Sequence, residues 1–221
     1  SFWTERNLAT ALSLALVLWE ITEKKEYKER LENLIEASFE SIYIPPNREG
    51  GCIKHYYSAH EGAKDDTLIC SPWMSALVVE QLWRYYSMTN DTQSASLIDS
   101  FGTHVANGGT YKGSAKHFKD FDIPYYLRFF GSSKYNMPNQ WTDIQHACDI
   151  GAMVAKSAYV RKKVNKNINK HIYVADNLMA SCEKTMIRAY KLKVWAISPL
   201  RKFNWWFSST SDIEWIIEQI K

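Results

Sequence analysis

Apolar residues recur along this chain in two alternating kinds of helical segment. Residues 5–22 contain the stretch ATALSLALVLW, which is apolar almost all round and therefore predicts a helix that is buried on most sides. Residues 24–42 instead carry one apolar stripe on a charged background, which is typical of an amphipathic surface helix. The same succession returns twice, in the pairs of segments 72–88 and 91–105, and 142–163 and 171–191.

Capping residues mark the expected helix ends. Ser71 followed by Pro72 is typical of a helix start, because serine is a good N-cap and proline is favoured in the first turn. Asn90 with Gln93 resembles a capping box and predicts that a helix opens there. A short last helix is predicted in DIEWIIEQI.

Long irregular stretches lead into the buried segments. Residues 45–70 are broken by paired prolines and paired glycines, and within them only CIKHYY suits a short strand. Residues 110–139 hold at least six aromatic residues and few helix signals, and so long a connection is usually functional or ordered by aromatic packing. We interpret RKFNWWFSS as an aromatic packing segment and VNKNINK as a solvated basic connection.

The buried segments start near residues 5, 72 and 141, roughly 66 to 69 residues apart. Each unit is then a hairpin of an inner and an outer helix, and such hairpins bury a continuous core only when they stack. The stretches SPWMSALVVEQLWRYYSMTND and QHACDIGAMVAKSAYVRKK, each entered by an aromatic-rich loop, resemble the (α/α) toroid, the six-hairpin fold of many glycoside hydrolases and polysaccharide lyases.

Three hairpins and a tail make up about half of such a ring. The expected fold is therefore all-α, an array of repeated helical hairpins with long aromatic-rich loops, like part of an (α/α) toroid. It is an incomplete toroid, a fragment of one or an open helical array. We expect one helical domain over residues 1–221, and its start at Ser-Phe-Trp favours a piece of a longer polypeptide.

Composition and net charge limit the classes of partner that we expect for this chain. Hydrophobic residues make up 46% of the chain and charged residues 23%, which is ordinary for a globular protein with a core. The net charge of +3 gives little reason to expect a nucleic-acid partner. The longest apolar run, residues 11–19, is too short to cross a bilayer, so we expect no membrane partner.

The four cysteines do not form a CxxC pair, which argues against a zinc knuckle. Cys52 and Cys70 flank one loop and could pair, but the sequence does not decide this. Cys148 and Cys182 fall within apolar helical patterns and are interpreted as buried thiols. We predict neither a metal site nor a cofactor.

The resemblance places a ligand cleft where the loops enter the inner helices. Candidate catalytic residues at that end are His55, Asp65, Asp66, Tyr126 and His146. Candidate substrate-binding residues are Tyr56, Trp73, Tyr125, Arg128 and Trp141. Aromatic rings at such positions can stack on sugars, and the alternative is a small core that packs the loops.

One reaction class that fits is glycoside hydrolysis, which needs two carboxylates about 5 to 10 Å apart. Adjacent residues seldom act as such a pair, so Asp65 or Asp66 would work with a second carboxylate, such as Asp143 or Asp149. The alternative is that Asp65-Asp66 is only an exposed turn or a helix N-terminal charge.

The other reaction class is polysaccharide cleavage by a lyase. The resemblance implies a tyrosine or histidine for proton transfer, here His55, Tyr56 or His146. Arg128 would then neutralise the carboxylate of a uronate. The alternative is that loop histidines and tyrosines are simply common in an aromatic-rich protein.

His146 and Asp149 lie one helical turn apart, and two ligands are too few for a metal site. His146 is nearer the loop end and keeps its claim to a functional role. Asp149 lies one turn deeper, where we expect it to hold a loop or a neighbouring helix by hydrogen bonds.

The leading expectation is a carbohydrate-active domain, catalytic or binding, that takes a polysaccharide or oligosaccharide in a loop-lined cleft. The alternative is a non-catalytic helical module that helps a larger protein to fold or assemble. An enzyme would bring the five candidate catalytic residues to one open cleft, whereas a scaffold would leave them dispersed or buried.

Overall fold

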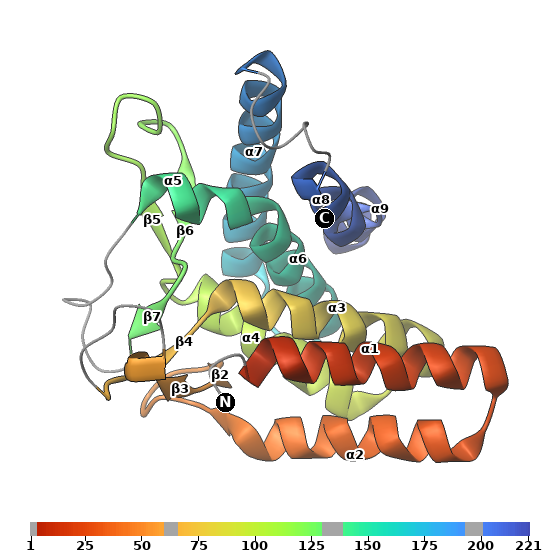
Figure 1. The fold of residues 1–221 in the computed structure, drawn as a ribbon. Coiled ribbons are helices and arrows are strands. Elements are labelled where there is room, and N and C mark those ends of the chain that lie inside the picture. The colour runs from red at the N-terminus through yellow and green to blue at the C-terminus, as the bar shows by residue number, and fades with distance from the viewer. Residues whose placement is uncertain (1–3, 60–65, 130–138, 193–200) are drawn as a thin grey trace.

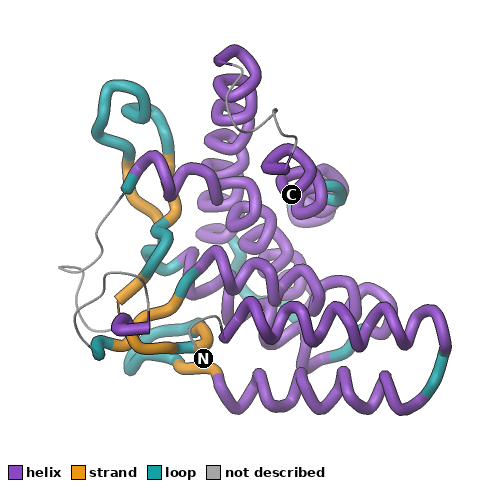
Figure 2. The backbone as a smooth tube through the Cα atoms, viewed as in Figure 1, coloured by secondary structure: helices purple, strands orange, loops and turns teal. Residues whose placement is uncertain are grey.

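The computed structural model describes residues 4–59, 66–129, 139–192 and 201–221, which are mostly helical (Figures 1 and 2). The helices are α1 (Thr4–Thr22), α2 (Lys25–Ser41), α3 (Pro72–Thr89), α4 (Thr92–Ala106), α5 (Gln140–Asp143), α6 (Ala147–Lys163), α7 (Asn169–Leu192), α8 (Arg201–Thr210) and α9 (Ile213–Ile220). The strands are β1 (Ile42–Tyr43), β2 (Cys52–Ile53), β3 (His55–Tyr56), β4 (Leu68–Cys70), β5 (Thr110–Lys112), β6 (Asp122–Pro124) and β7 (Arg128–Phe129). The predicted all-α class is confirmed.

The long helices pair as successive hairpins, α1 with α2, α3 with α4, and α6 with α7. Helix α3 packs against both α1 and α6, so these three form one layer. Helix α4 packs against α2 and α7 in a second layer and also lies against α6. Helices α8 and α9 both contact α6, and Figure 1 shows them to its right.

Local capping chemistry sets the boundary between α3 and α4. The Ser71 hydroxyl accepts a hydrogen bond from the Met74 N–H at 3.4 Å and caps α3 as predicted. Asn90 ends α3 in the left-handed conformation, at φ 56°, which asparagine tolerates better than most residues. The N-cap of α4 is Asp91, whose carboxylate accepts from the Ser94 N–H at 2.7 Å, so the prediction that Asn90 opens this helix is wrong by one residue.

Helices α4 and α6 approach each other closely because of a glycine. A Cβ atom on Gly102 would overlap the side chain of Ser157 on α6. The Ser157 hydroxyl in turn donates to the backbone carbonyl of Asp99 at 3.3 Å. Together with α3, α7, α8 and α9, this contact buries α6 on nearly every side, as its apolar pattern predicts.

The main core lies between the two helical layers, and a second, smaller core lies under the β5–β6 hairpin. Trp206 of α8 is buried in the second core, and its indole N–H donates to the carbonyl of Gln145 at 2.9 Å. The packing role predicted for this aromatic segment is therefore confirmed at Trp206, but the segment is a helix, which the sequence reading missed.

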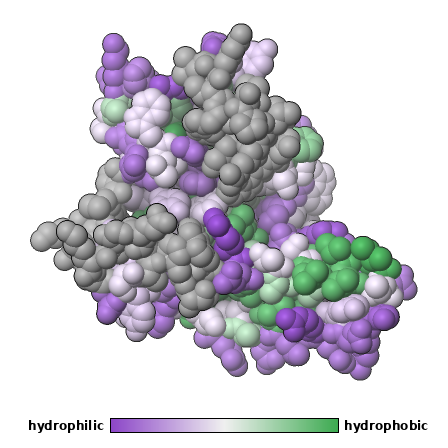
Figure 3. All heavy atoms as spheres, viewed as in Figure 1, coloured by the Kyte–Doolittle hydropathy of each residue, from purple (hydrophilic) through white to green (hydrophobic). Residues whose placement is uncertain are grey.

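Helix α1 is not buried on most sides, contrary to the prediction. Leu14 is 60% exposed and Ile21 is 76% exposed, and Figure 3 shows hydrophobic side chains gathered over this helix. The reason is that α1 stands at the edge of its layer, with α3 on one side and no helix opposite it among the described residues. No helix in the described part of the chain is both long and apolar enough to cross a bilayer.

Short antiparallel strands order the connections. Strand β1 pairs with β2, β3 with β4, β4 with β7, and β5 with β6. The strand predicted in CIKHYY is present as β2 and β3. The β5–β6 hairpin lies in a stretch that was expected to be irregular, and the β4–β7 pairing places Cys70 opposite Arg128.

Candidate functional site

Three predicted site residues meet at the loop end of the inner helices. We call Trp73, Tyr126 and His146 the aromatic cluster. The Trp73 and Tyr126 rings stack with centroids 6.0 Å apart, and the His146 ring lies 4.7 Å from Trp73 and 5.7 Å from Tyr126. The Arg6 guanidinium lies 5.2 Å from the Trp73 ring. Trp73 and His146 are only 4% and 5% exposed, so the cluster is largely buried.

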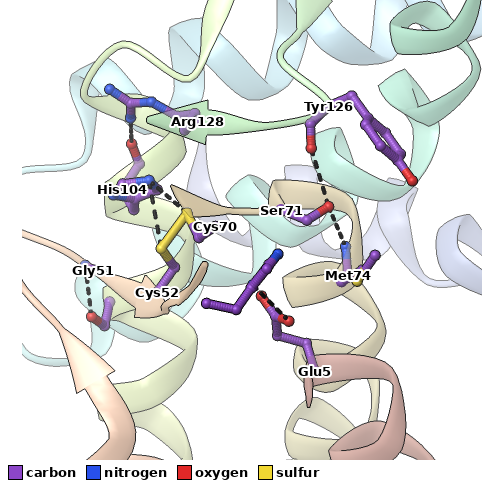
Figure 4. The surroundings of a disulfide bond; sticks show 11 residues. Glu5, Gly51, Cys52, Cys70, Ser71, Met74, His104, Tyr126 and Arg128 are labelled. Carbon is purple, nitrogen blue, oxygen red and sulfur yellow. Dashed lines mark hydrogen bonds and ion pairs between the residues drawn. A yellow bond between two sulfur atoms is a disulfide. The ribbon is translucent and has the colours of Figure 1, made fainter. Parts of the chain in front are cut away.

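A single hydroxyl ties this cluster to the start of α3. Besides capping α3 through Met74, the Ser71 hydroxyl donates to the backbone carbonyl of Tyr126 at 3.1 Å. Figure 4 shows Ser71 between these two partners, with Glu5 of α1 beside them. The loop that carries Tyr126 is thus held directly over the first turn of an inner helix.

Asp149 connects the cluster to the helices beneath it. One carboxylate oxygen lies 3.5 Å from Nδ1 of His146, and the other accepts a hydrogen bond from the Ser209 hydroxyl at 2.8 Å. Both His146 and Asp149 are buried. Because Ser209 belongs to α8, the prediction that Asp149 holds a neighbouring helix by hydrogen bonding is confirmed.

A pocket of about 210 Å³ opens next to Asp149. We call it the carboxylate pocket; its lining residues include Glu80 and Gln81 of α3, Asp149 of α6, and Ser208 and Ser209 of α8. Two carboxylates from neighbouring inner helices therefore face one cavity. Acid–base hydrolysis requires such a pair of groups.

Glu80 is held by a buried lysine. Lys156 of α6, only 1% exposed, donates to the Glu80 carboxylate at 2.6 Å and lies 3.8 Å from the carboxylate of Asp212. Burial raises the pKa of Glu80, and the negative charges of Asp212 and Asp149 add to this, while Lys156 opposes it. Glu80 is therefore shifted toward its protonated form.

A second buried acid lies near the aromatic cluster. Glu5 of α1 is fully buried, and its carboxylate lies 3.6 Å from Nδ1 of His55 on β3. Burial raises the pKa of Glu5 to about 7, although the backbone N–H groups of Glu5 and Ser71 partly offset the effect. His55 thus faces a buried carboxyl group.

The other predicted catalytic residues lie elsewhere. Asp66 is exposed and accepts a hydrogen bond from Ser58. Asp65 lies outside the described residues. Asp143 is buried and accepts from the Tyr111 hydroxyl at 2.6 Å, and burial raises its pKa to about 6. A backbone hydrogen bond from Tyr126 lowers this pKa, so Asp143 anchors the loop that carries Tyr126.

The remaining substrate-binding candidates are dispersed. Tyr56 is exposed on β3, and Tyr125 packs against Tyr111 with centroids 4.6 Å apart. Trp141 is exposed and meets the Phe118 ring edge-on at 4.8 Å. Among the described residues, Tyr56, Tyr125 and Trp141 therefore lie outside the aromatic cluster of Trp73, Tyr126 and His146.

Arg128 is also separate from the aromatic cluster. It is buried and donates to the backbone carbonyl of His104 at 2.6 Å, beside the disulfide between Cys52 and Cys70 (Figure 4). The reason is the strand register, because Arg128 pairs with Cys70 across β4 and β7.

Both cysteine pairs form disulfides. Cys52 pairs with Cys70, the alternative that the sequence left open, and Cys148 pairs with Cys182, so the interpretation of the latter two as buried thiols is wrong. Helices α6 and α7 bring the Cα atoms of the second pair within 4.8 Å, a normal disulfide spacing.

The first disulfide lies beside a histidine. Within the described residues, the donor atoms of Cys52, Cys70 and His104 lie within 4.8 Å of one another, close enough to share a metal ion. The two sulfur atoms are bonded to each other, however, so they do not offer the thiolates that such an ion would need. Burial, with help from Arg128 and Arg48, lowers the pKa of His104 to about 3.

The sequence analysis did not predict a role for Glu80 or Lys156. Each lies inside a helix that is apolar almost all round, in VVEQL and VAKSA. A charge in such a helix must be buried and paired, because burial of an isolated charge is strongly unfavourable. Opposite charges in these two apolar helices could therefore have predicted an ion pair between them.

No protein-family model matches the chain, and no curated protein or solved structure matches it either.

Proposed function

We propose that this chain is a carbohydrate-active domain that hydrolyses glycosidic bonds in the carboxylate pocket. The observation that carries the proposal is that Glu80 and Asp149, from neighbouring inner helices, line the same cavity. The stacked hairpins, with inner helices α1, α3 and α6 and outer helices α2, α4 and α7, support an arrangement like part of an (α/α) toroid. In that arrangement the cavity lies among the inner helices.

The two carboxyl groups would have different roles. Glu80, whose pKa is raised by burial, would donate a proton to the glycosidic oxygen as its bond to the anomeric carbon breaks. Asp149 would accept a proton from the water whose oxygen bonds to that carbon. The Ser209 hydroxyl orients Asp149 from one side and His146 faces it from the other.

The aromatic cluster suits the binding part of the reaction. Tyr126 is partly exposed and stacks on Trp73, and such rings provide flat apolar faces that match the C–H face of a sugar. His146 joins this cluster to Asp149, so a sugar against Tyr126 would be coupled to the pocket through two side-chain contacts.

Hydrolysis of a panel of neutral and acidic polysaccharides tests the proposal. The wild-type protein should release new reducing ends from at least one polymer. Glu80→Gln and Asp149→Asn should each lower the rate at least a hundredfold, which is the usual contribution of a general acid or base. Glu36→Gln, at an exposed glutamate of α2, is the matched control and should retain the wild-type rate.

Two results would contradict the proposal. One is wild-type turnover in Glu80→Gln or Asp149→Asn. The other is a wild-type protein that folds but cleaves no polymer in the panel.

A non-catalytic helical module is the second candidate, and one observation favours it. Trp73 and His146 are almost fully buried, as expected if the aromatic cluster only packs the loops onto the helices. In that case Trp73→Ala would lower the melting temperature. No variant would change a rate of hydrolysis, because the wild-type protein itself would not hydrolyse polysaccharides.

A further inference from the structure

A larger cavity lies on the other side of the helical layers from the carboxylate pocket. We call it the arginine pocket, and its volume is about 460 Å³, within the range of small-molecule sites. It is lined by α2, β1, the β1–β2 connection, α4, the end of α6 and the connection after α6. It shares no lining residue with the carboxylate pocket.

The floor of the arginine pocket is a buried guanidinium. Arg161 is 8% exposed, and its Nη1 donates to Asp99 at 2.8 Å and to Thr103 at 3.0 Å, while its Nε donates to the carbonyl of Asn167 at 3.1 Å. Lys166 also donates to Asp99, at 2.7 Å. These contacts hold Arg161 in one orientation and hold the pKa of Asp99 below its ordinary value, against the effect of burial.

The remaining nitrogen of Arg161 has a weaker partner. Among the described residues, Nη2 contacts only the Glu49 carboxylate, at 3.4 Å, and the Glu49 side chain is 75% exposed. An ion pair with so exposed a partner contributes little free energy, because water competes for both charges. The contact between Glu49 and Nη2 is therefore weak, and another carboxylate can replace Glu49 at little cost.

The walls add a second cation and an apolar face. Arg48 lines the pocket, is exposed and has no ion pair among the described residues. Phe39, which is 52% exposed, and Ile44 line the pocket as well. The serine hydroxyls of α4, at Ser96 and Ser100, supply polar groups that can accept or donate hydrogen bonds.

Gly50 allows this wall to form. It has a φ of 78°, and a Cβ at this position would collide with the backbone of His104. The β1–β2 connection can therefore lie directly on α4, and the Gly51 N–H donates to the Ser100 hydroxyl at 3.0 Å. The place of Arg48 and Glu49 in the pocket wall is thus set by backbone contacts between the β1–β2 connection and α4.

We propose that the arginine pocket binds a uronic acid residue of a short acidic oligosaccharide. The sugar carboxylate displaces Glu49 from Nη2 of Arg161 and also pairs with Arg48, while the apolar face of the ring lies on Phe39. A carboxylate suits this place because a carboxylate already contacts Nη2, and a hydrogen bond between a guanidinium N–H and a carboxylate is stronger than one between neutral groups. The requirement for a carboxylate comes from the pocket alone, and the choice of a sugar rests on the proposed function.

Calorimetric titration of the folded protein with galacturonic acid trimer tests this proposal. The wild-type protein should bind the trimer and should not bind maltotriose, its neutral counterpart. Arg48→Ala should weaken binding about tenfold, and Phe39→Ala should weaken it several-fold. Glu49→Ala should strengthen binding about two- to fivefold, because it removes the competing carboxylate.

Matched controls separate this site from the carboxylate pocket. Lys170→Ala, which removes an exposed cation that bonds Asn107, should leave binding unchanged. The double variant Glu80→Gln/Asp149→Asn should also bind the trimer normally, so the binding result does not depend on whether the protein is a hydrolase. All the single variants change exposed side chains, and their melting curves should match that of the wild type.

Three outcomes would overturn the proposal. They are the absence of trimer binding, equal affinity in Arg48→Ala and wild type, and no gain of affinity in Glu49→Ala. If decanoate or inorganic phosphate binds in place of the trimer, the pocket takes another anion and the assignment to a sugar acid is wrong.

Discussion

Helix α6 carries two buried cations, Lys156 and Arg161, five residues apart. The carboxylate that pairs with Lys156 has a raised pKa, whereas the one that pairs with Arg161 has a lowered pKa. Arg161 and its neighbours give Asp99 several donors, from Arg161, Lys166 and Thr103, and the pKa of Asp99 lies below its ordinary value. Lys156 gives Glu80 a single short contact, and the pKa of Glu80 is raised. Both carboxylates are desolvated, so the number of donors decides which charge state is favoured.

This difference separates a network that holds its carboxylate as an anion from one that favours a protonated carboxyl group. Asp99 is held as an anion, and its ion pair with Arg161 links α4 to α6. Glu80 lies beside Asp149 and Asp212, and these negative charges add to the effect of burial. A carboxyl group that is short of donors and close to other carboxylates is the kind of group that can release a proton during a reaction.

Arg161→Met should produce the largest loss of stability. It removes a buried guanidinium from the half-buried Asp99, which keeps Lys166 and Thr103, so the cost should lie at the lower end of the about 3–5 kcal/mol of breaking a buried ion pair. Urea unfolding at pH 7 measures the change. Arg84→Met, which removes an exposed contact to Glu20, is the control and should cost less than about 1 kcal/mol. Equal losses in the two variants would contradict the structural role of Arg161.

Glu5→Gln extends the comparison to a buried carboxyl group with even fewer side-chain donors. The folded-state pKa of about 7 exceeds the ordinary value of 4.5, so between these values the folded state binds more protons than the unfolded state. Wild-type stability should therefore fall as the pH rises from 4.5 to 7, by up to about 3 kcal/mol, because one pKa unit corresponds to about 1.4 kcal/mol.

Unfolding curves at several pH values measure this effect. The stability of Glu5→Gln should vary less with pH, and the variant should be the more stable protein at pH 7.5. A variant with the same pH dependence as the wild type would show that Glu5 does not titrate in this range.

Lys156→Met should cost less than Arg161→Met, about 1–3 kcal/mol at pH 7, the usual penalty for an unsatisfied buried group. The loss should shrink at pH 5, because Glu80 can take up a proton and no longer needs the cation. Urea unfolding at both pH values measures the difference. A loss that is the same at pH 5 and pH 7 would mean that Glu80 stays ionised without its partner.

Asp149→Asn should produce the smallest effect, a slight decrease in the pKa of Glu80. The Asp149 charge is one of the factors that raise this pKa, and the substitution removes it with little change in shape. Side-chain carboxyl NMR measures the shift, and Glu36→Gln should cause none. An unchanged pKa of Glu80 would show that the two carboxyl groups are not electrostatically coupled.

The helices were predictable because each reflects a local pattern. The apolar segment predicted at 5–22 is α1 at Thr4–Thr22, and the start of α3 follows from Ser71 and Pro72. Helix α8 was missed because its many aromatic residues obscured the helical period. The β4–β7 pairing was missed because it joins strands far apart in the sequence, and the β5–β6 hairpin was missed because its strands are only three residues long and lie in a stretch without clear alternation.

The candidate site was predictable only in part. The sequence placed Trp73, Tyr126 and His146 at one end of the inner helices, and they do meet there. It did not indicate that Arg128 would point to the disulfide, because that direction is set by pairing across the sheet. The roles of Glu80 and Lys156 depend on how α3 faces α6, and a pattern within one helix does not contain this information.

The measurement that tests the central claim most directly is a side-chain carboxyl titration of the wild-type protein by NMR. Glu80 and Asp99 should be followed in the same sample, so that each serves as the reference for the other. Glu80 should titrate above 4.5 and Asp99 below 3.8. If Glu80 titrates at or below 4.5, the carboxylate pocket lacks its proton donor and the proposed hydrolysis fails.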